Sequence, residues 1–277
     1  MKRTSEDPRP SLPSSLYDEA YFLTACEGYE EFAETHGQRL SRRLAAAFQY
    51  AEVAPGMTVL DIGCGRGEIV RQCTRLGASA YGIDYARTAV RMAREALASE
   101  DGASPQKAGV AQGDATRLPF PSGTIDRVLM FDVVEHLYPW ELETALAEAW
   151  RVLRSPGGKL VVHTAPNGWY DRYAYPFVRL FRRLSGLGAN YPRDPRALNV
   201  AVNLDVHVNE QSALSLWRAL RRAGFRPLRA WLDSPPQNRK EGPALRAVRA
   251  VLFGLPPFSW FFEREVFAVG EKRVAYP

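Results

Sequence analysis

Apolar and polar residues follow two different periods along this chain. Between residues 57 and 164, short runs rich in Val, Ile and Leu alternate with segments whose apolar residues recur three or four positions apart. The first pattern is typical of buried strands, and the second of helices with one apolar face. Strands are therefore expected at 57–62, 79–84, 109–112, 126–131 and 158–164, and helices at 66–76, 86–98 and 139–153.

Strands that alternate with helices predict an α/β fold, doubly wound around a mostly parallel sheet. Before this core, Leu40, Leu44 and Phe48 recur at helical spacing, and the Pro55-Gly56 pair ends that segment. Beyond the core, the same reasoning predicts a helix over 210–223 closed by Gly224 and strands over 225–232 and 262–270.

These patterns predict one domain over 17–277 after a disordered leader, 1–16. Two irregular segments interrupt it, and long insertions in a compact α/β domain are commonly lids or binding loops. The domain is expected to consist of a helical cap (17–52), a core (53–164), a lid or substrate insertion (165–209), and a closing helix and strands (210–277) with a further insertion (233–259).

Composition narrows the class of protein. The net charge of +5 over 277 residues permits nucleic-acid binding without implying it. No run reaches the roughly 18–20 uncharged apolar residues of a membrane span, and residues 1–16 lack the apolar stretch of a signal peptide. We therefore expect a cytoplasmic protein. Its three cysteines have no metal-site spacing, so no disulfide framework and no metal site are predicted.

The most informative stretch is VLDIGCGRG (59–67), an apolar strand that runs into a glycine-rich turn and then a helix. Such a turn brings backbone N–H groups close to a ligand. Asp84 ends the second strand, where a carboxylate can accept both hydroxyls of a ribose. Asp114, within QGDA after the third strand, can accept from an exocyclic adenine amine. The series predicts an adenosine-containing ligand.

Together these residues resemble the class I methyltransferases that use S-adenosyl-L-methionine. The runs FDVVEHL (131–137) and EAWRVLRSPGGKLVV (148–162) resemble the ubiquinone/menaquinone-biosynthesis branch of that family, the methyltransferase type 11 branch. The resemblance covers about 53–164 and the closing strands. It implies a Rossmann-like sheet of seven strands whose last strand runs antiparallel.

The resemblance also implies a cofactor site. In that family the glycine loop wraps the methionine part, while acids at the Asp84 and Asp114 positions face the ribose and the adenine. Asp61 either organises the loop or meets the methionine amine. A nicotinamide dinucleotide fits less well, because the spacing is GxGxG rather than GxGxxG. The implied cofactor-binding set is Asp61, Gly63, Cys64, Gly65, Gly67, Asp84, Tyr85, Gly113, Asp114, Ala115 and Phe131.

The sequence defines the methyl acceptor much less closely than the cofactor. A hydroxyl acceptor needs a group that removes its proton, and His136 follows the fourth strand at the ligand-binding edge of the sheet. His136 is thus the candidate catalytic base, and loop fixation is its alternative role. We expect methyl transfer to a small or lipid-like acceptor at oxygen. The alternatives are N- or C-methylation of a metabolite and a non-catalytic binding subunit.

Three other histidines and several tyrosines are weaker candidates. His163 is expected in the core, and His207 lies in the insertion, where capping or loop packing competes with a place in the acceptor pocket. His36 lies in the cap, which can close over the cofactor. Tyr17, Tyr21 and Tyr29 can meet the cofactor's carboxylate or pack within the cap.

The insertion 165–209 has an amphipathic part. Tyr173, Phe177, Leu180, Phe181 and Leu184 can share one helix face opposite three arginines, which suits a lipid-like acceptor or a membrane surface. Peripheral membrane contact is therefore expected through 172–185, and a packed lid helix is the alternative. No exocyclic-amine methylation motif follows the fourth strand, so a nucleic-acid partner is not expected. No obligate protein partner is evident.

Overall fold

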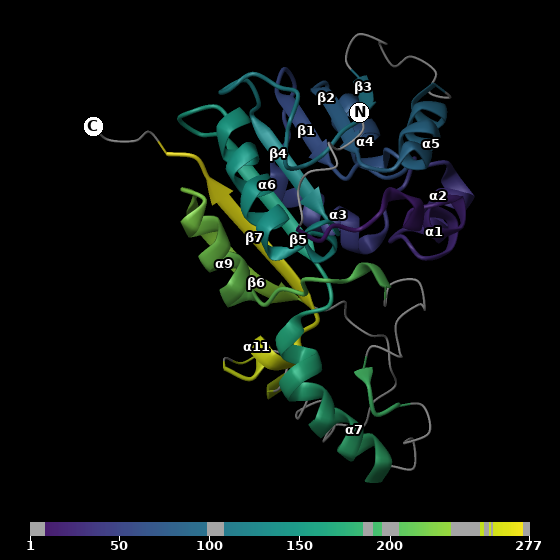
Figure 1. Cartoon of the computed structure of the whole chain (residues 1–277), viewed down its shortest axis with the longest axis vertical. Coiled ribbons are helices and arrows are strands. Elements are labelled where there is room, and N and C mark those ends of the chain that lie inside the picture. Colours follow the sequence, from purple (N-terminus) through teal and green to yellow (C-terminus); the bar gives the residue numbers. More distant parts are fainter. Residues whose placement is uncertain are drawn as a thin grey trace.

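In the computed structural model, one seven-stranded sheet organises the chain (Figure 1). The structure describes residues 9–98, 108–184, 191–195, 205–233, 250, 251, 255 and 257–273. The strand order is β3-β2-β1-β4-β5-β7-β6. The strands are β1 (Thr58–Ile62), β2 (Ser79–Asp84), β3 (Ala108–Gln112), β4 (Arg127–Phe131), β5 (Lys159–Thr164), β6 (Arg226–Asp233) and β7 (Glu265–Glu271).

Strand direction confirms the predicted fold class. The pairs β1–β2, β2–β3, β1–β4 and β4–β5 are parallel. The last strand, β7, lies between β5 and β6 and is antiparallel to both. Each of the first five strands begins or ends within two residues of its predicted bounds. The doubly wound, mostly parallel sheet with an antiparallel last strand is thus confirmed.

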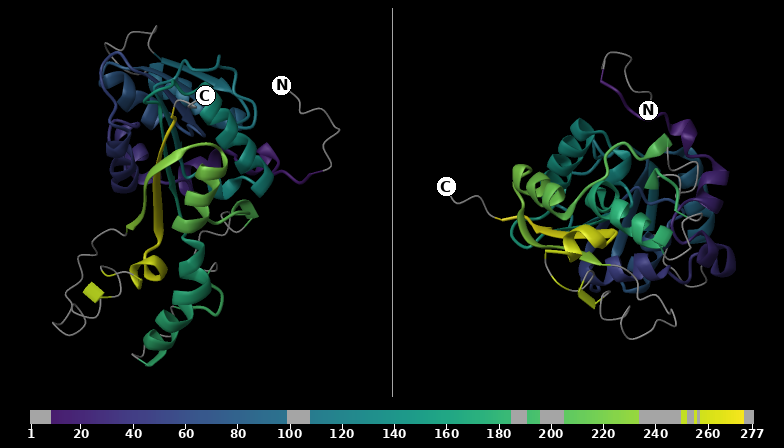
Figure 2. Two further views of the ribbon diagram at one scale, coloured as in Figure 1. Left: turned by 90° about the vertical axis from the view of Figure 1, so that its left-hand side faces the viewer. Right: turned by 90° about the horizontal axis from the view of Figure 1, so that it is seen from below.

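Helices cover both faces of the sheet (Figures 1 and 2). The buried stripes of α6 (Pro139–Val152) and α9 (Ala213–Arg222) pack on one face, against side chains such as Leu60, Val128 and Leu160. On the other face, α3 (Arg42–Phe48) and α4 (Glu68–Arg75) pack against Val59 and Val161. Helix α5 (Arg87–Ala98) contacts β2, β3 and α4. Both faces are buried because parallel sheets carry apolar residues on each side.

The cap differs from its prediction. Instead of one helical stretch over 17–52, the structure has α1 (Glu19–Thr24), α2 (Tyr29–Thr35), α3 (Arg42–Phe48) and the 3₁₀ turns η1 (Ser14–Leu16) and η2 (Gln49–Ala51). The breaks fall at Gly28, with φ of 76°, and at His36 and Gly37, with φ of 51° and 78°. Left-handed backbone ends a helix, and glycine adopts it without steric cost.

The structure describes part of the expected leader. Residues 1–8 lie outside the described part, whereas residues 9–16 contact the domain. Trp140 Nε1 donates to the carbonyl of Pro10 at 3.0 Å, and the Arg9 guanidinium lies over the Trp140 ring. These contacts with α6 were not visible in the sequence pattern, and the division into a leader over 1–16 and a domain over 17–277 stays a prediction.

Both insertions contain some regular structure. After β5, a π-helical turn η4 (Tyr170–Ala174) leads into α7 (Tyr175–Leu184), which projects away from the sheet (Figures 1 and 2). Residues 185–190, 196–204 and most of 234–256 lie outside the described part. The short helix α11 (Ser259–Phe262) occupies the start of the strand predicted from 262, so β7 begins later. None of the described helices has the length and apolarity that a bilayer crossing requires.

Candidate functional site

A cavity of about 230 Å³ opens at the carboxyl ends of the central strands. The strand order changes direction at this point, because β2 and β3 lie on one side of β1 whereas β4 and β5 lie on the other. Open α/β sheets bind ligands at such a point. The cavity is lined by His136 and by ten of the eleven residues predicted to hold the cofactor, namely Asp61, Gly63, Cys64, Gly65, Asp84, Tyr85, Gly113, Asp114, Ala115 and Phe131.

The glycine turn forms one wall of this cavity. Gly63 and Gly65 have φ of 72° and 49°, and the N–H groups of Gly63 and Cys64 donate to the Ile83 carbonyl at 2.8 and 3.0 Å. A Cβ on Gly63 would lie 2.4 Å from Val133 Cγ2, so no larger residue fits there without a shift. Gly67 does not line the cavity; it begins α4 with φ of 85°.

Two aspartates at the ends of neighbouring strands face the cavity. Asp84 ends β2, and its carboxylate accepts from the backbone N–H groups of Gly65 and Ala86 at 2.9 and 2.8 Å. Burial raises the pKa of Asp84 to about 6, against these backbone hydrogen bonds, which lower it. Asp114 follows β3 and accepts from the backbone N–H and hydroxyl of Thr116 at 2.8 and 2.7 Å. The pair offers carboxylate oxygens along one sheet edge.

Asp61 is the least exposed acid of the cofactor set. It belongs to β1, is only 4% exposed, and lines the cavity behind the glycine turn. Burial raises its pKa well above the usual value, and the neighbouring carboxylates of Glu68 and Asp84 raise it further. A buried acid of this kind is stabilised by a cationic partner, which is what a ligand ammonium group supplies.

The cap closes the cavity opposite the sheet. Tyr17, Tyr21 and Phe22 line it, whereas Tyr29 is exposed and neither it nor His36 is among the lining residues. The buried guanidinium of Arg66, from the glycine turn, donates to the carbonyls of Phe22 and Glu27 and to Glu68. Arg66 therefore fastens the cap to the turn. The sequence analysis did not predict this role of Arg66, although an arginine between two glycines of a ligand-binding loop could have indicated it.

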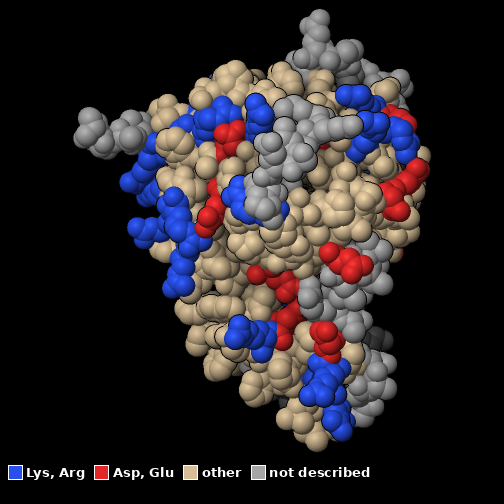
Figure 3. Space-filling model, in the orientation of Figure 1, with Lys and Arg blue, Asp and Glu red and all other residues tan. Residues whose placement is uncertain are grey.

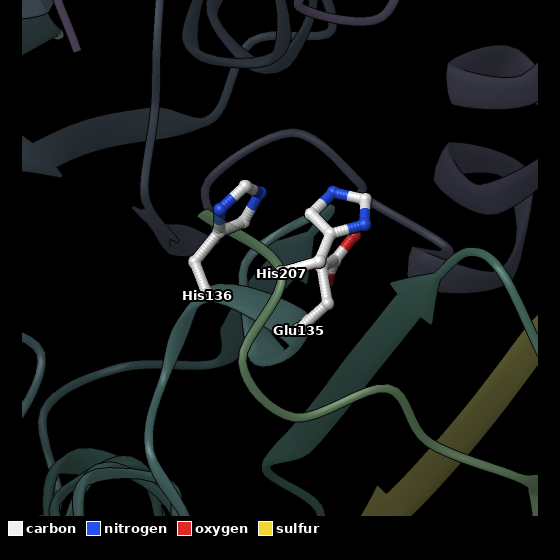
Figure 4. A group of neighbouring side chains, drawn as sticks. All are labelled: Glu135, His136 and His207. Carbon is white, nitrogen blue, oxygen red and sulfur yellow. The ribbon is translucent and has the colours of Figure 1, made fainter. Parts of the chain in front are cut away.

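A second cluster of polar residues lies at the other end of the cavity. Glu135 and His136 belong to the 3₁₀ turn η3 (Val134–His136), and His207 comes from the insertion (Figure 4). The two imidazole rings lie 5.0 Å apart at 82°, and the N–H groups of Val208 and Asn209 donate to the Glu135 carbonyl at 2.9 and 3.0 Å. These backbone bonds hold the insertion against η3, so His207 does reach the pocket.

Burial changes the protonation of this cluster. Burial and the nearby His207 lower the pKa of His136 to about 3, so its ring is neutral at pH 7. Burial and the neighbouring Asp132 raise the pKa of Glu135 above its usual value. His136 Nδ1 is also hydrogen-bonded to the Tyr17 hydroxyl at 3.2 Å. A neutral imidazole at this position can accept a hydrogen bond from an acceptor molecule.

Beneath this cluster lies a buried charged layer that sequence reasoning did not find. Asp132 has φ of 54°, unusual for a residue other than glycine, and lies 2.9 Å from His163 Nδ1. Burial raises the pKa of Asp132, but His163 and Arg43 outweigh it and hold the carboxyl ionised. Arg43 also contacts Glu265 on β7 at 3.2 Å. His163 is thus a core histidine, as predicted, with a charged partner.

The residues present fit the cofactor that the sequence implies. Asp84 and Asp114 place acceptors at adjacent strand ends, as a ribose and an adenine amine require. The glycine turn brings the backbone to the cavity without side chains, and Asp61 supplies a buried acid beside it. A nucleoside with a positively charged amino-acid tail matches this set of donors and acceptors.

Glu135, His136 and His207 also have the chemistry of metal ligands. One ligand atom from each lies within 4.8 Å of the others. However, Thr164 Oγ1 donates to Glu135 at 2.8 Å, and Tyr17 is hydrogen-bonded to His136. We interpret the cluster as a hydrogen-bonding wall, and the expectation that the protein needs no metal stays a prediction.

Comparisons with known proteins agree with this geometry. Residues 60–162 match the family model described as a methyltransferase domain. A probable S-adenosylmethionine-dependent methyltransferase of Mycolicibacterium smegmatis is 32% identical over 162 residues, which are 58% of this chain and 56% of that protein. A ubiquinone/menaquinone biosynthesis C-methyltransferase of Bordetella parapertussis is 39% identical over 115 residues, 40% of this chain and 42% of that protein. The chain therefore spans about half the length of these relatives.

Solved structures share the fold. Geranyl diphosphate methyltransferase in complex with S-adenosylmethionine superposes with a TM-score of 0.56 at 20% identity, over 90% of this chain and 92% of that one. At this level of identity the likeness concerns the fold alone.

Proposed function

We propose that this chain, whose residues 60–162 match a methyltransferase domain, is a class I methyltransferase that transfers the methyl group of S-adenosylmethionine to a small or lipid-like acceptor, at oxygen. The observation that carries the proposal is the cavity at the carboxyl ends of β1, β2 and β4. It has cofactor-type residues at one end and neutral His136 at the other.

Bound S-adenosylmethionine supplies a methyl carbon activated by a sulfonium. In our proposal, Asp84 accepts from the ribose hydroxyls, Asp114 accepts from the adenine amine, and Asp61 faces the methionine ammonium. The glycine turn at Gly63 and Gly65 lets the backbone follow the methionine part. The cap, held by Arg66, covers part of the cavity. Most of the rate enhancement then comes from positioning.

At the acceptor end, His136 receives the proton of a hydroxyl as the oxygen takes the methyl group. Its neutral ring is able to accept the proton. Burial disfavours the imidazolium that forms, and the ionised Asp132 offsets part of that penalty. In the structure, the Tyr17 hydroxyl is hydrogen-bonded to His136 Nδ1, and the acceptor hydroxyl replaces it when the acceptor binds. The proton moves from the acceptor to Nδ1, and solvent removes it when the product leaves.

A lipid-like acceptor is supported by the apolar side of the cavity. Tyr21 and Phe22 line it from the cap, and Leu12 lines it from the segment before the cap. Val133 and Leu137 line it from the turn after β4. The relative from Bordetella parapertussis acts, by its name, in ubiquinone/menaquinone biosynthesis. Apolar walls with a few convergent polar groups are typical of sites for such molecules.

Methylation at carbon is the second candidate function. The name of the Bordetella relative specifies a C-methyltransferase, and a carbon nucleophile next to a phenol or enol hydroxyl also needs a proton acceptor. The position of the transferred methyl in the product, determined by NMR with a ¹³C-methyl cofactor, separates O- from C- and N-methylation. A cofactor-binding subunit without catalysis would give no product at all.

The first test is calorimetric titration of the protein with S-adenosylmethionine, S-adenosylhomocysteine and NAD. We expect both sulfur ligands to bind in the micromolar range and NAD not to bind. Asp84→Asn should weaken the sulfur ligands about 10- to 100-fold. The matched control is Asp126→Asn, at the opposite end of the sheet, where the carboxylate accepts from the Thr58 N–H. Absence of binding by the unmodified protein would overturn the proposal.

A further inference from the structure

The helix that projects from the sheet exposes large apolar side chains. In α7, Phe177 is 69% exposed, Leu180 is 57% exposed and Leu184 is 80% exposed. Soluble monomers rarely present several such side chains side by side, and larger apolar patches mark interaction surfaces. We call the set of exposed apolar residues at this end the tip surface, and it consists of Tyr173, Phe177, Leu180, Phe181, Leu184, Phe258 and Trp260.

Two distant segments build the tip surface. The Trp169 ring stacks on Phe261 of α11, with centroids 5.1 Å apart and planes at 16°. Asn167 Nδ2 donates to the carbonyls of Trp260 and Glu263 at 3.0 and 2.9 Å. These contacts tie α11 to the start of η4, so the aromatic residues around α11 lie at the base of α7 (Figures 1 and 2).

Basic side chains accompany the apolar ones. Residues 170–184 carry Arg172, Arg179, Arg182 and Arg183 against a single acid, Asp171. Basic atoms lie at the far end of the projecting part, and acidic atoms lie between them and the body of the molecule (Figure 3). Apolar side chains flanked by arginines are typical of helices that lie in the interface of a membrane with anionic lipids.

We propose that the tip surface docks on an anionic lipid bilayer, with α7 in the headgroup region and the arginines on lipid phosphates. Nucleic acid would pair with the arginines but would leave a leucine such as Leu184 in water. The proposal rests on the proposed function through the lipid-like acceptor. Helix α7 follows β5 at the same sheet edge as the cavity, and Ala165, just after β5, lines that cavity. Docking therefore brings the acceptor end of the site towards the membrane.

Vesicle flotation of the full chain tests the proposal. We expect binding to phosphatidylcholine vesicles that contain about 30% phosphatidylglycerol, none to phosphatidylcholine alone, and release at about 0.5 M salt. The double variant Leu180→Glu/Leu184→Glu should lower the bound fraction at least about tenfold. Its matched control is Leu76→Glu/Leu228→Glu, which changes leucines that are 44% and 42% exposed elsewhere. Arg182→Gln/Arg183→Gln should weaken binding and reduce its salt dependence.

Several outcomes overturn the proposal. One is absence of flotation by the unmodified chain, and another is an equal loss in the control variant. A third is a dimer, seen by light scattering, that Leu180→Glu/Leu184→Glu dissociates while no vesicles bind, because the tip surface is then an interface between two copies. Calorimetry with S-adenosylmethionine on the same samples separates the two proposals. Retained cofactor binding without flotation rejects only the membrane proposal, and flotation without cofactor binding rejects only the methyl-transfer proposal.

Discussion

Tyr17 Oη lies 3.2 Å from His136 Nδ1, although 119 residues separate them in the sequence. The contact joins the turn before α1 to the turn after β4, and both residues line the cavity. Their rings also meet edge to face, with centroids 5.6 Å apart. The cap therefore contacts the acceptor end of the site directly as well as covering the cofactor end.

Replacing Tyr17 by phenylalanine tests this contact. The ring stays and one hydrogen bond to His136 is lost, which is worth about 1 kcal/mol. Because the acceptor hydroxyl replaces the Tyr17 hydroxyl at Nδ1, we expect the KM for the true acceptor to fall roughly 5-fold, while kcat and the Kd for S-adenosylmethionine change little. In a His136→Ala background, Tyr17→Phe should have no further effect on this KM, because the contact is already absent. A fall in cofactor affinity alone would contradict this role.

Cofactor binding should depend on the protonation of Asp84. Its pKa of about 6 lies above that of the unfolded chain, so the carboxyl is neutral below pH 6 in the folded protein. A neutral carboxyl accepts less well from ribose hydroxyls, so affinity for S-adenosylmethionine should fall below pH 6 and stay constant above pH 7. Calorimetry between pH 5 and 8 measures this, and Asp84→Asn should reduce the dependence and leave the part that comes from Asp61, whose pKa burial also raises.

The pH profile of kcat should show no loss of activity in the acidic range from protonation of His136. Since the pKa of His136 is lowered to about 3, the ring stays neutral through the range in which an ordinary histidine titrates. At saturating cofactor, kcat should therefore be flat from pH 5.5 to 7.5. A limb near pH 6.5 that disappears in His136→Gln would contradict the buried, neutral state of the ring.

Gly63 tolerates no side chain. Gly63→Ala brings a Cβ to 2.4 Å from Val133 and strains a backbone with φ of 72°, so we expect a loss of about 2–4 kcal/mol in the free energy of unfolding. Gly123→Ala is the control, because Gly123 also has φ of 72° but nothing within 4 Å of its Cβ position. It should cost only about 1 kcal/mol. Equal losses in urea denaturation would assign the whole effect to the backbone angle.

Arg66→Met should loosen the cap. It removes donors from two buried carbonyls and leaves Glu68 without its ion pair, at a cost of about 3 kcal/mol. Limited proteolysis should then cut between residues 24 and 40 before the core, and S-adenosylmethionine should slow that cleavage. Arg91→Met, in an exposed pair with Glu19 and Glu95, should cost less than about 1 kcal/mol and leave the cap protected.

The cofactor end could be predicted from the sequence because its residues are local. The glycine turn, Asp84 and Asp114 each follow a strand whose period identifies it, and parallel strands bring their carboxyl ends together. The acceptor end could not, since Tyr17, His136 and His207 meet only through tertiary contacts. Asp132 and Arg43 were missed for the same reason. The cap was predicted as one helical segment because the left-handed backbone conformation of residues such as His36 does not change the spacing of apolar residues in the sequence.

The position of β7 has a consequence for how the protein is made. This last strand pairs with both β5 and β6, so during translation the sheet has an open edge at β5 until residues 265–271 leave the ribosome. Up to that moment β6, although already synthesised, lacks the neighbour on which it docks. Nascent chains of this protein therefore carry an unpaired, apolar strand edge until β7 has emerged, and a chaperone that covers this edge would protect the chain from aggregation.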